Sequence, residues 1–212
     1  MRITHLGHAA VLVEVADRRI LIDPGNFSNA WHGLEDLDAI LVTHQHPDHI
    51  DPANVGDLLA ANPQAAVHVE PQVLDAVDLA RGDGMAADTR LDLGGVTVSA
   101  VGGLHAIIHR DIPRIANVGL VVSAEGEPTF FHPGDSLDTA PAGVDVLALP
   151  MMGPWAAMKE HIDFARSVGA ASGFGIHNAL LSDRGWNLAF NRYNEMTPTT
   201  VHDLRSGEAW QP

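Results

Sequence analysis

Short apolar runs separated by turn residues predict a strand-rich beginning of the chain. Gly7 and the pair Asp17-Arg18 interrupt these runs, as glycine and polar residues do at turns. We expect four strands in this part, at Arg2–Leu6, Ala10–Val15, Arg19–Ile22 and Leu37–Thr43. The last run is apolar almost throughout, which is typical of a strand buried on both faces.

Helices and a strand follow this first group. Asp51 is suited to an N-cap, and Pro52 fits the first turn of a helix, where its missing N–H is not needed. We therefore expect a helix at Pro52–Ala61, a strand at Ala66–Val69 and a helix at Pro71–Ala80.

The second half of the chain repeats this order. We expect a strand at Val96–Val101, a hairpin of Val118–Ala124 with Pro128–His132, a strand at Asp145–Leu149, a helix at Ala156–Val168, a strand at Ala171–Ile176 and a helix at Trp186–Glu195. Each half thus has a strand-rich part followed by helices. This order predicts an α/β protein, a four-layer αββα sandwich formed by residues 1–212 as one domain.

The charge balance restricts the partners of the protein. The 212 residues include 12 Lys and Arg against 27 Asp and Glu, so the formal net charge is −15. A protein of this charge repels phosphodiester backbones, so we expect a small-molecule substrate and no nucleic acid.

Membrane and export signals are not visible in the sequence. No apolar run is long enough to span a bilayer, and the N-terminus lacks the pattern of a signal peptide. The absence of cysteine excludes disulfides and thiolate ligands. We expect a cytoplasmic protein without a membrane partner. A homo-oligomer is compatible with the sequence.

The stretch His44-Gln45-His46-Pro47-Asp48-His49 carries the densest candidate chemistry. Neutral imidazole is a common metal ligand, and a carboxylate supplies an oxygen ligand or an orienting acceptor. Extended backbone through His46 would point His44 and His46 the same way, and Pro47 would then bend the chain. Asp48 and His49 could then face a second position close by, which suits a site for two metal ions.

Further ligand candidates follow other predicted strands. They are His105 after Gly102-Gly103, Asp135 within His132-Pro133-Gly134-Asp135-Ser136, and His177 after Gly175-Ile176. In this order the motifs resemble those of the metallo-β-lactamase fold superfamily, and the resemblance covers nearly the whole chain. The openings Thr4-His5-Leu6-Gly7-His8-Ala9 and Ile22-Asp23-Pro24-Gly25 are similar to the compact branch that includes ascorbate-phosphate lactonase-like hydrolases. Gly175 departs from that branch, in which a proline is common at this position.

The resemblance implies the αββα fold and a division of the ligands between two ions. His44, His46 and His105 would hold the first ion, Asp48, His49 and His177 the second, and Asp135 would bridge both. Zinc is the first choice for such a His and Asp set, with manganese, iron or nickel as alternatives.

These residues predict a metal-dependent hydrolase. A metal-bound hydroxide would attack a small ester, lactone or phosphodiester, and Asp48, the expected catalytic residue, would orient it and could carry its proton. A nuclease or phosphodiesterase of the same fold, a diiron redox enzyme, a β-lactamase and a non-catalytic metal-binding protein are the alternatives.

Several residues outside the ligand set have expected roles. Asp23 would accept a hydrogen bond from a ligand imidazole and fix its tautomer. His8 is expected at the rim of the site. The segment between His105 and Asn117 would form a wall of the substrate site, where Arg110 and Arg114 suit a carboxylate or phosphate of an anionic substrate.

Overall fold

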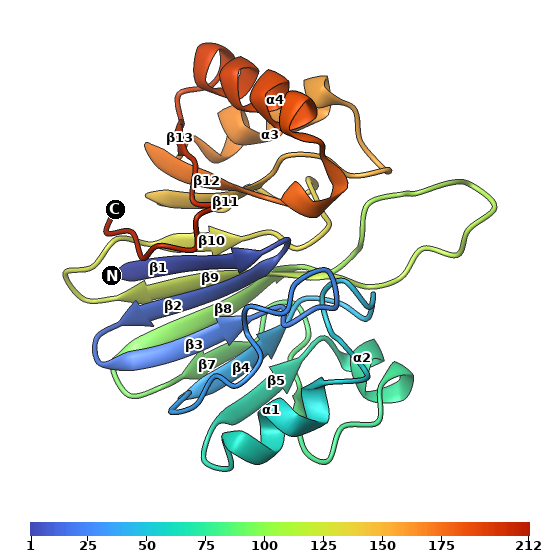
Figure 1. Ribbon diagram of the computed structural model, residues 1–212, viewed down its shortest axis with the longest axis vertical. Helices are drawn as coiled ribbons and strands as arrows, with labels where there is room; N and C mark the ends of the chain where they lie inside the picture. The colour runs from blue at the N-terminus through green and yellow to red at the C-terminus, as the bar shows by residue number, and fades with distance from the viewer.

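Two β-sheets packed face to face form the centre of the molecule (Figure 1). The computed structural model describes residues 1–212. One sheet has six strands in the order β1-β2-β3-β4-β5-β6, and the other has seven in the order β13-β12-β11-β10-β9-β8-β7. The strands of the first sheet are β1 (Arg2–Gly7), β2 (Ala10–Val15), β3 (Arg18–Ile22), β4 (Ala39–Val42), β5 (Ala66–Val69) and β6 (Asp83–Gly84).

The second sheet repeats the plan of the first. Its strands are β7 (Arg90–Asp92), β8 (Val96–Gly102), β9 (Val118–Ala124), β10 (Phe130–His132), β11 (Val146–Pro150), β12 (Ser172–Ile176) and β13 (Thr200–His202). In each sheet an antiparallel group, β1-β2-β3 or β7-β8-β9-β10, is followed by parallel strands. This confirms the two-part symmetry that the order of elements predicted.

Helices cover the outer faces of the two sheets (Figure 1). The helices are α1 (Val55–Ala61), α2 (Pro71–Ala76), α3 (Met158–Val168) and α4 (Asp183–Met196), with a short 3₁₀ helix at Asn178–Leu180. The expected αββα sandwich is thus the observed fold. None of these helices combines the length and the apolar character that crossing a membrane requires.

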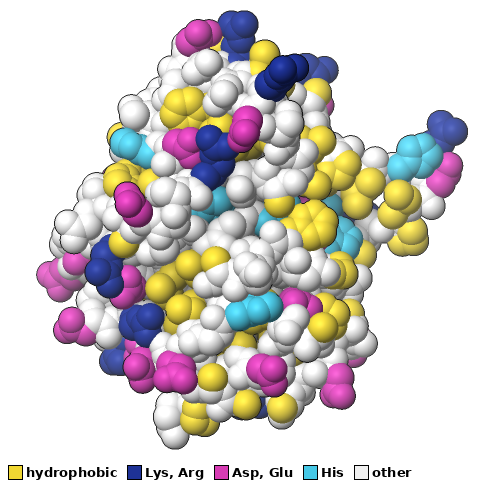
Figure 2. Space-filling model, in the orientation of Figure 1, with side chains coloured by type: hydrophobic (Ala, Val, Ile, Leu, Met, Phe, Trp, Pro, Cys, Tyr) yellow, Lys and Arg dark blue, Asp and Glu magenta, His cyan; other side chains and the backbone are white.

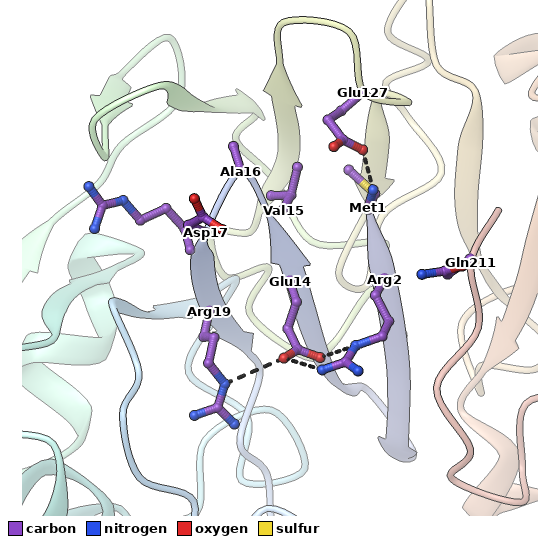
Figure 3. Close-up of a pocket in the computed structure, with 10 residues that line it drawn as sticks. Met1, Arg2, Glu14, Val15, Ala16, Asp17, Arg19, Glu127 and Gln211 are labelled. Atoms are coloured by element: carbon purple, nitrogen blue, oxygen red, sulfur yellow. Dashed lines mark hydrogen bonds and ion pairs between the residues drawn. The ribbon is translucent and has the colours of Figure 1, made fainter.

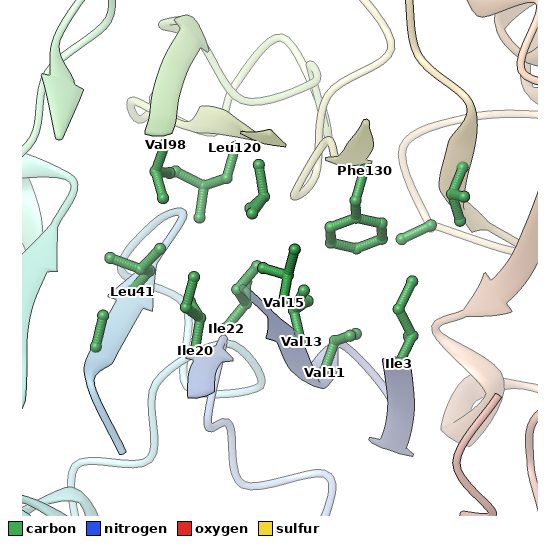
Figure 4. Close-up of a cluster of buried hydrophobic side chains, with 14 of the residues drawn as sticks. Ile3, Val11, Val13, Val15, Ile20, Ile22, Leu41, Val98, Leu120 and Phe130 are labelled. Atoms are coloured by element: carbon green, nitrogen blue, oxygen red, sulfur yellow. The ribbon is translucent and has the colours of Figure 1, made fainter. Parts of the chain in front are cut away.

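Alternation along the central strands explains the layers. In β2, Val11, Val13 and Val15 point into the core between the sheets, while Ala10 and Leu12 face the layer beneath α1 and α2. A strand with apolar residues on both faces must be covered on both faces. The second sheet covers one face of β2, and the helical layer covers the other. Figure 4 shows the inner core, where Ile3, Ile20, Ile22 and Leu41 of the first sheet meet Val98, Leu120 and Phe130 of the second.

Helix boundaries differ from the predicted ones by a few residues. Helix α1 begins at Val55 rather than Pro52, because Asp51 instead binds the backbone N–H of Ala53 and the side chain of Asn54 in a preceding turn. Helix α2 ends at Ala76 instead of Ala80, where the extended Val77 packs into the outer apolar layer. Helix α4 begins three residues before Trp186, at Asp183, where the hydroxyl of Ser182 accepts a hydrogen bond from Gly185 N–H.

Acid should destabilise the metal-free protein through buried histidines such as His5. Burial lowers the pKa of His5 to about 4, against an ordinary 6.5. The unfolded chain therefore binds a proton between these values that the folded chain does not, so stability is lost as the pH falls from 6.5 toward 4. We expect the free energy of unfolding, measured with urea at pH 7 and pH 5, to drop more in the wild type than in His5→Gln. Equal pH dependence in both would contradict this.

Candidate metal centre

The candidate ligands gather at one edge of the sandwich. Strands β1, β4, β8, β10 and β12 all run toward this edge, and each is followed there by a histidine or an aspartate. Carboxyl ends of parallel strands meet at the same edge of a sheet, and the facing sheets bring the two sets together. All seven ligand candidates from the sequence lie here: His44, His46, Asp48, His49, His105, Asp135 and His177.

One group consists of His44, His46, His105 and Asp135. Its four donor atoms lie within 4.8 Å of one another. His44 Nε2 is 3.0 Å from His46 Nδ1, and His105 Nε2 is 3.3 Å from Asp135 Oδ2. The backbone leaves the strand at Val42, so His44 and His46 converge from a loop rather than from the extended strand that the sequence predicted.

A second group consists of His8, His49 and His177. Its donor atoms also lie within 4.8 Å of one another. Asp135 Oδ1 is 3.0 Å from both His49 Nε2 and His177 Nε2, while its other oxygen faces the first group. Asp135 therefore lies between the two groups, in the position expected of a bridging carboxylate.

His8 is buried within the centre, so its expected position at the rim is wrong. Only 1% of the residue is exposed, and its ring stacks on His177 with centroids 4.7 Å apart. His8 Nε2 lies 3.0 Å from Asp48 Oδ2. The cause is the tight turn after β1, where His8 takes a left-handed backbone conformation, with φ at 53°.

The ring nitrogens of three histidines indicate that a cation belongs here. The Nδ1 atoms of His49, His105 and His177 each lie within 3 Å of an oxygen acceptor, on Asp23, Ala106 and Met152. Donation from Nδ1 leaves Nε2 as a bare acceptor, and all three Nε2 atoms are buried without a hydrogen-bond partner. Acceptors that face the carboxylate of Asp135 need a positive charge between them, so the residues present fit divalent cations.

The pKa shifts in the centre also indicate that it requires positive charge. Burial lowers the pKa of His49, but Asp135 and Asp23 outweigh it and raise that pKa well above the ordinary value. Burial likewise raises the pKa of Asp135, but His177 and His49 bring it well below the usual range. Burial also lowers the pKa of His44, which stays a neutral ligand candidate. Both shifts have the same cause, because the centre favours positive charge next to the carboxylate of Asp135.

Asp23 supports the centre from behind, as the sequence predicted. Its carboxylate is fully buried and lies 2.6 Å from His49 Nδ1. It also accepts hydrogen bonds from the backbone N–H and the hydroxyl of Thr43, at 2.8 and 2.7 Å. The same carboxylate therefore fixes the ring of His49 and the start of the loop that carries the ligands.

Two further residues position Asp135, and sequence reasoning missed their role. The side chain of Asn117 accepts a hydrogen bond from Asp135 N–H at 3.0 Å and donates to Pro133 O at 2.9 Å. The ring of His132 accepts a hydrogen bond from Gly134 N–H and lies 3.0 Å from the backbone oxygen of Ala9, in the turn between β1 and β2. The motif around Asp135 contained His132, but nothing in the sequence showed where its ring points.

Close packing at Gly25 holds the ligand loop in place. A Cβ at this position would lie 1.8 Å from the backbone oxygen of Asp48. We expect Gly25→Ala to displace the loop, to cost at least about 2 kcal/mol of stability and to lower the metal content after purification. The control is Gly56→Ala, because a Cβ at Gly56 meets nothing within 4 Å. Equal metal content in both variants would refute this role of Gly25.

The segment between β8 and β9 projects from the body of the molecule (Figure 1). We call residues 104–116 the projection. Arg110 lies far out on it with 87% of its side chain exposed, and Arg114 is paired with Asp138 at 2.5 Å. This placement does not support the expected anion pocket of two arginines.

A cavity of about 500 Å³ lies away from the candidate ligands (Figure 3). It is lined by residues at the start of β1, whereas His8 follows the end of that strand. Apart from Asp17, its charged side chains are already paired; Glu14, for example, contacts Arg2 at 2.6 Å and Arg19 at 3.6 Å. We therefore assign this cavity no part in the chemistry.

Comparison with known proteins agrees with the fold and the centre. Residues 2–172 match the family described as Beta-lactamase superfamily domain. Protein Rv0786c of Mycobacterium tuberculosis is 40% identical over 206 residues, which cover 96% of each chain. A UPF0173 metal-dependent hydrolase of Aeropyrum pernix is 33% identical over 153 residues, covering 64% of this chain and 61% of that protein.

A solved structure gives the same result for the fold. The metallo-beta-lactamase fold protein YhfI from Bacillus subtilis superposes with a TM-score of 0.75 at 17% identity, and the match covers 100% of this chain and 99% of that one. With its two sheets, its clustered ligand candidates and the match over most of its length, the chain belongs to the metallo-β-lactamase superfamily.

Proposed function

We propose that the protein is a metal-dependent hydrolase that acts on a small ester, lactone or phosphodiester with two divalent cations, zinc being the first choice. One observation carries the proposal: the bare Nε2 atoms of His49, His105 and His177 converge on the carboxylate of Asp135 in a buried centre. The name metal-dependent hydrolase of the Aeropyrum pernix relative supports it. If the opening motifs place the protein near ascorbate-phosphate lactonase-like hydrolases, as the sequence alone suggests, lactones belong among the substrates to test.

The ligand assignment takes the first group as it stands, and in the second it uses Asp48 in place of His8, whose Nε2 lies 3.0 Å from the Asp48 carboxylate. His44, His46 and His105 would hold one ion, His49, His177 and Asp48 the other, and Asp135 both. When bound, such ions polarise a substrate oxygen and lower the pKa of water toward neutrality. The buried rings exclude bulk solvent from this point, which strengthens every charge interaction there.

Asp48 is the candidate for contact with the attacking water. Burial raises its pKa, but the hydrogen bond from His8 and the nearby His49 lower it to about 2. Asp48 is thus a carboxylate at neutral pH, and 24% of its side chain is exposed, so water can reach it. It can accept a hydrogen bond from that water and orient it, while His8 keeps the carboxylate in place.

The proposed function is tested by measuring hydrolysis of a panel of substrates by the metal-free and the metal-loaded protein. Protein stripped with a chelator and protein reloaded with zinc, manganese, iron or nickel are compared on 4-nitrophenyl esters, simple lactones and bis(4-nitrophenyl) phosphate. We expect hydrolysis of at least one class after reloading and none in the stripped state. Undiminished hydrolysis in the stripped protein, or none with two ions bound, would contradict the proposal.

A further inference from the structure

A cavity of about 340 Å³ lies beside the candidate metal centre. Its lining continues directly from the segments that carry the ligands. Ala106 and Ile107 follow His105, and Leu137 and Asp138 follow Asp135. The remaining lining residues are Arg114, Trp155, Ala156 and Glu160. A group held at the centre is therefore next to this space.

Trp155 forms the wall that the cavity shares with the centre. Its Nε1 donates a hydrogen bond to Asp135 Oδ2 at 2.9 Å, and its ring centroid lies 6.2 Å from that of His105. The indole lies so close over Gly153 that a Cβ there would be 2.4 Å from it, and the ring of His161 lies 5.6 Å away. These contacts fix the indole in one position, as a specific binding site requires.

The charged residues of the lining already have partners. Arg114 pairs with Asp138 at 2.5 Å and also donates to the backbone oxygen of His105. Glu160 accepts a hydrogen bond from Ala157 N–H at 2.5 Å. The unpartnered surface of the cavity is therefore mostly aliphatic and aromatic, and it offers more to an apolar group than to an ion.

The projection extends this apolar surface. Ile107 is 61% exposed, and further aliphatic residues of the projection are exposed too: Leu104, Ile108 and Ile112. Figure 2 shows apolar side chains along the projection, with charged side chains and a histidine at its end. Aliphatic side chains exposed beside a reactive centre are typical of a site that binds an apolar group.

We propose that this cavity binds the apolar acyl chain of the substrate, with Ile107, Leu137, Trp155 and Ala156 as its specificity-determining residues. This rests on the proposed hydrolase function and narrows it to esters of aliphatic carboxylic acids, or to lactones with an alkyl substituent on the ring carbon next to the carbonyl. The reacting carbonyl would lie at the metal centre, and the chain would extend past Trp155 toward the projection.

Binding of alkyl hydroxamates tests the proposal without any turnover. The hydroxamate head chelates divalent cations, and aceto-, hexano- and octanohydroxamate differ only in the chain. Titration calorimetry on the zinc-loaded protein should show the affinity rising about twofold to fourfold per methylene that enters the cavity. No rise with chain length in the wild type would overturn the proposal.

Two variants and a control test whether the alkyl chain of the hydroxamate lies in the cavity. Ala156→Phe fills the cavity and should remove the advantage of octano- over acetohydroxamate, and Ile107→Ser should reduce it. Leu188→Ser removes an exposed aliphatic side chain of α4 that belongs neither to the cavity nor to the projection, and it should leave the ratio unchanged. An unchanged ratio in Ala156→Phe would overturn the proposal.

Two further measurements separate the possible failures. If no hydroxamate binds the zinc-loaded protein, the metal centre is at fault, and octanoate against acetate on the zinc-free protein then tests the cavity alone. If the zinc-free wild type prefers octanoate and Ala156→Phe loses that preference, the result supports the proposed acyl-chain site. If the wild type shows no preference for octanoate, the proposal is overturned. In sedimentation, a dimer that dissociates in Ile107→Ser would show that a second copy occupies this surface, which would also overturn the proposal.

Discussion

Asp48→Asn should lower kcat/KM for any substrate of this protein by about 10²–10⁴-fold, with no loss of the fold. The amide keeps an oxygen that can accept from His8, 3.0 Å from Asp48 in the wild type, so the loop should stay in place. It loses the negative charge that would face a cation and orient the attacking water. Steady-state kinetics and circular dichroism on the metal-loaded variant measure both effects.

His68→Ala is the control for this loss. His68 lies in β5, on the strand next to β4, and it belongs to neither ligand group. It should keep most of the activity. Turnover of Asp48→Asn within a factor of a few of the wild type would rule out the role assigned to Asp48.

Asp23→Asn should weaken metal binding by about 10–100-fold and cost about 3 kcal/mol of stability. Asp23 faces three donors, two from Thr43 and one from His49. An amide presents its NH₂ group to at least one of them, so a buried donor loses its acceptor. Competition with a chelator measures the affinity, and urea unfolding of the metal-free protein measures the stability.

Asp88→Asn is the matched control for Asp23→Asn. Asp88 also has a left-handed backbone, with φ at 66° against 51° for Asp23, but it is exposed. It should change neither quantity, because asparagine tolerates this conformation. If Asp23→Asn binds metal as tightly as Asp88→Asn does, the support assigned to Asp23 is wrong.

The layers of the fold could be predicted because the pattern of its strands is strong. Apolar residues on both faces of β2 and β4 require cover on both sides, and the second sheet and the helices α1 and α2 supply it. The helical stripe at Met158–Val168 covers the outer face of the second sheet in the same way. Strands β6, β7 and β13 escaped prediction, since they have only two or three residues and are partly exposed. Such strands form because a neighbouring edge offers hydrogen bonds, which no local pattern records.

The candidate site was predictable where its residues are close in sequence or follow a motif. His44, His46, Asp48 and His49 lie in one loop, and His105, Asp135 and His177 follow strands in a familiar order. His8 was misplaced, because its contact with Asp48 spans 40 residues and depends on the turn after β1. Trp155 was not considered at all, since only the folded chain brings its indole to Asp135.

Metal stoichiometry tests the central claim most directly. After expression with ample zinc, elemental analysis of the purified protein against its own concentration gives the number of ions per chain. The two groups of donors that share Asp135 predict two ions per chain in the fully loaded protein. A value well below one per chain would contradict the two-metal account.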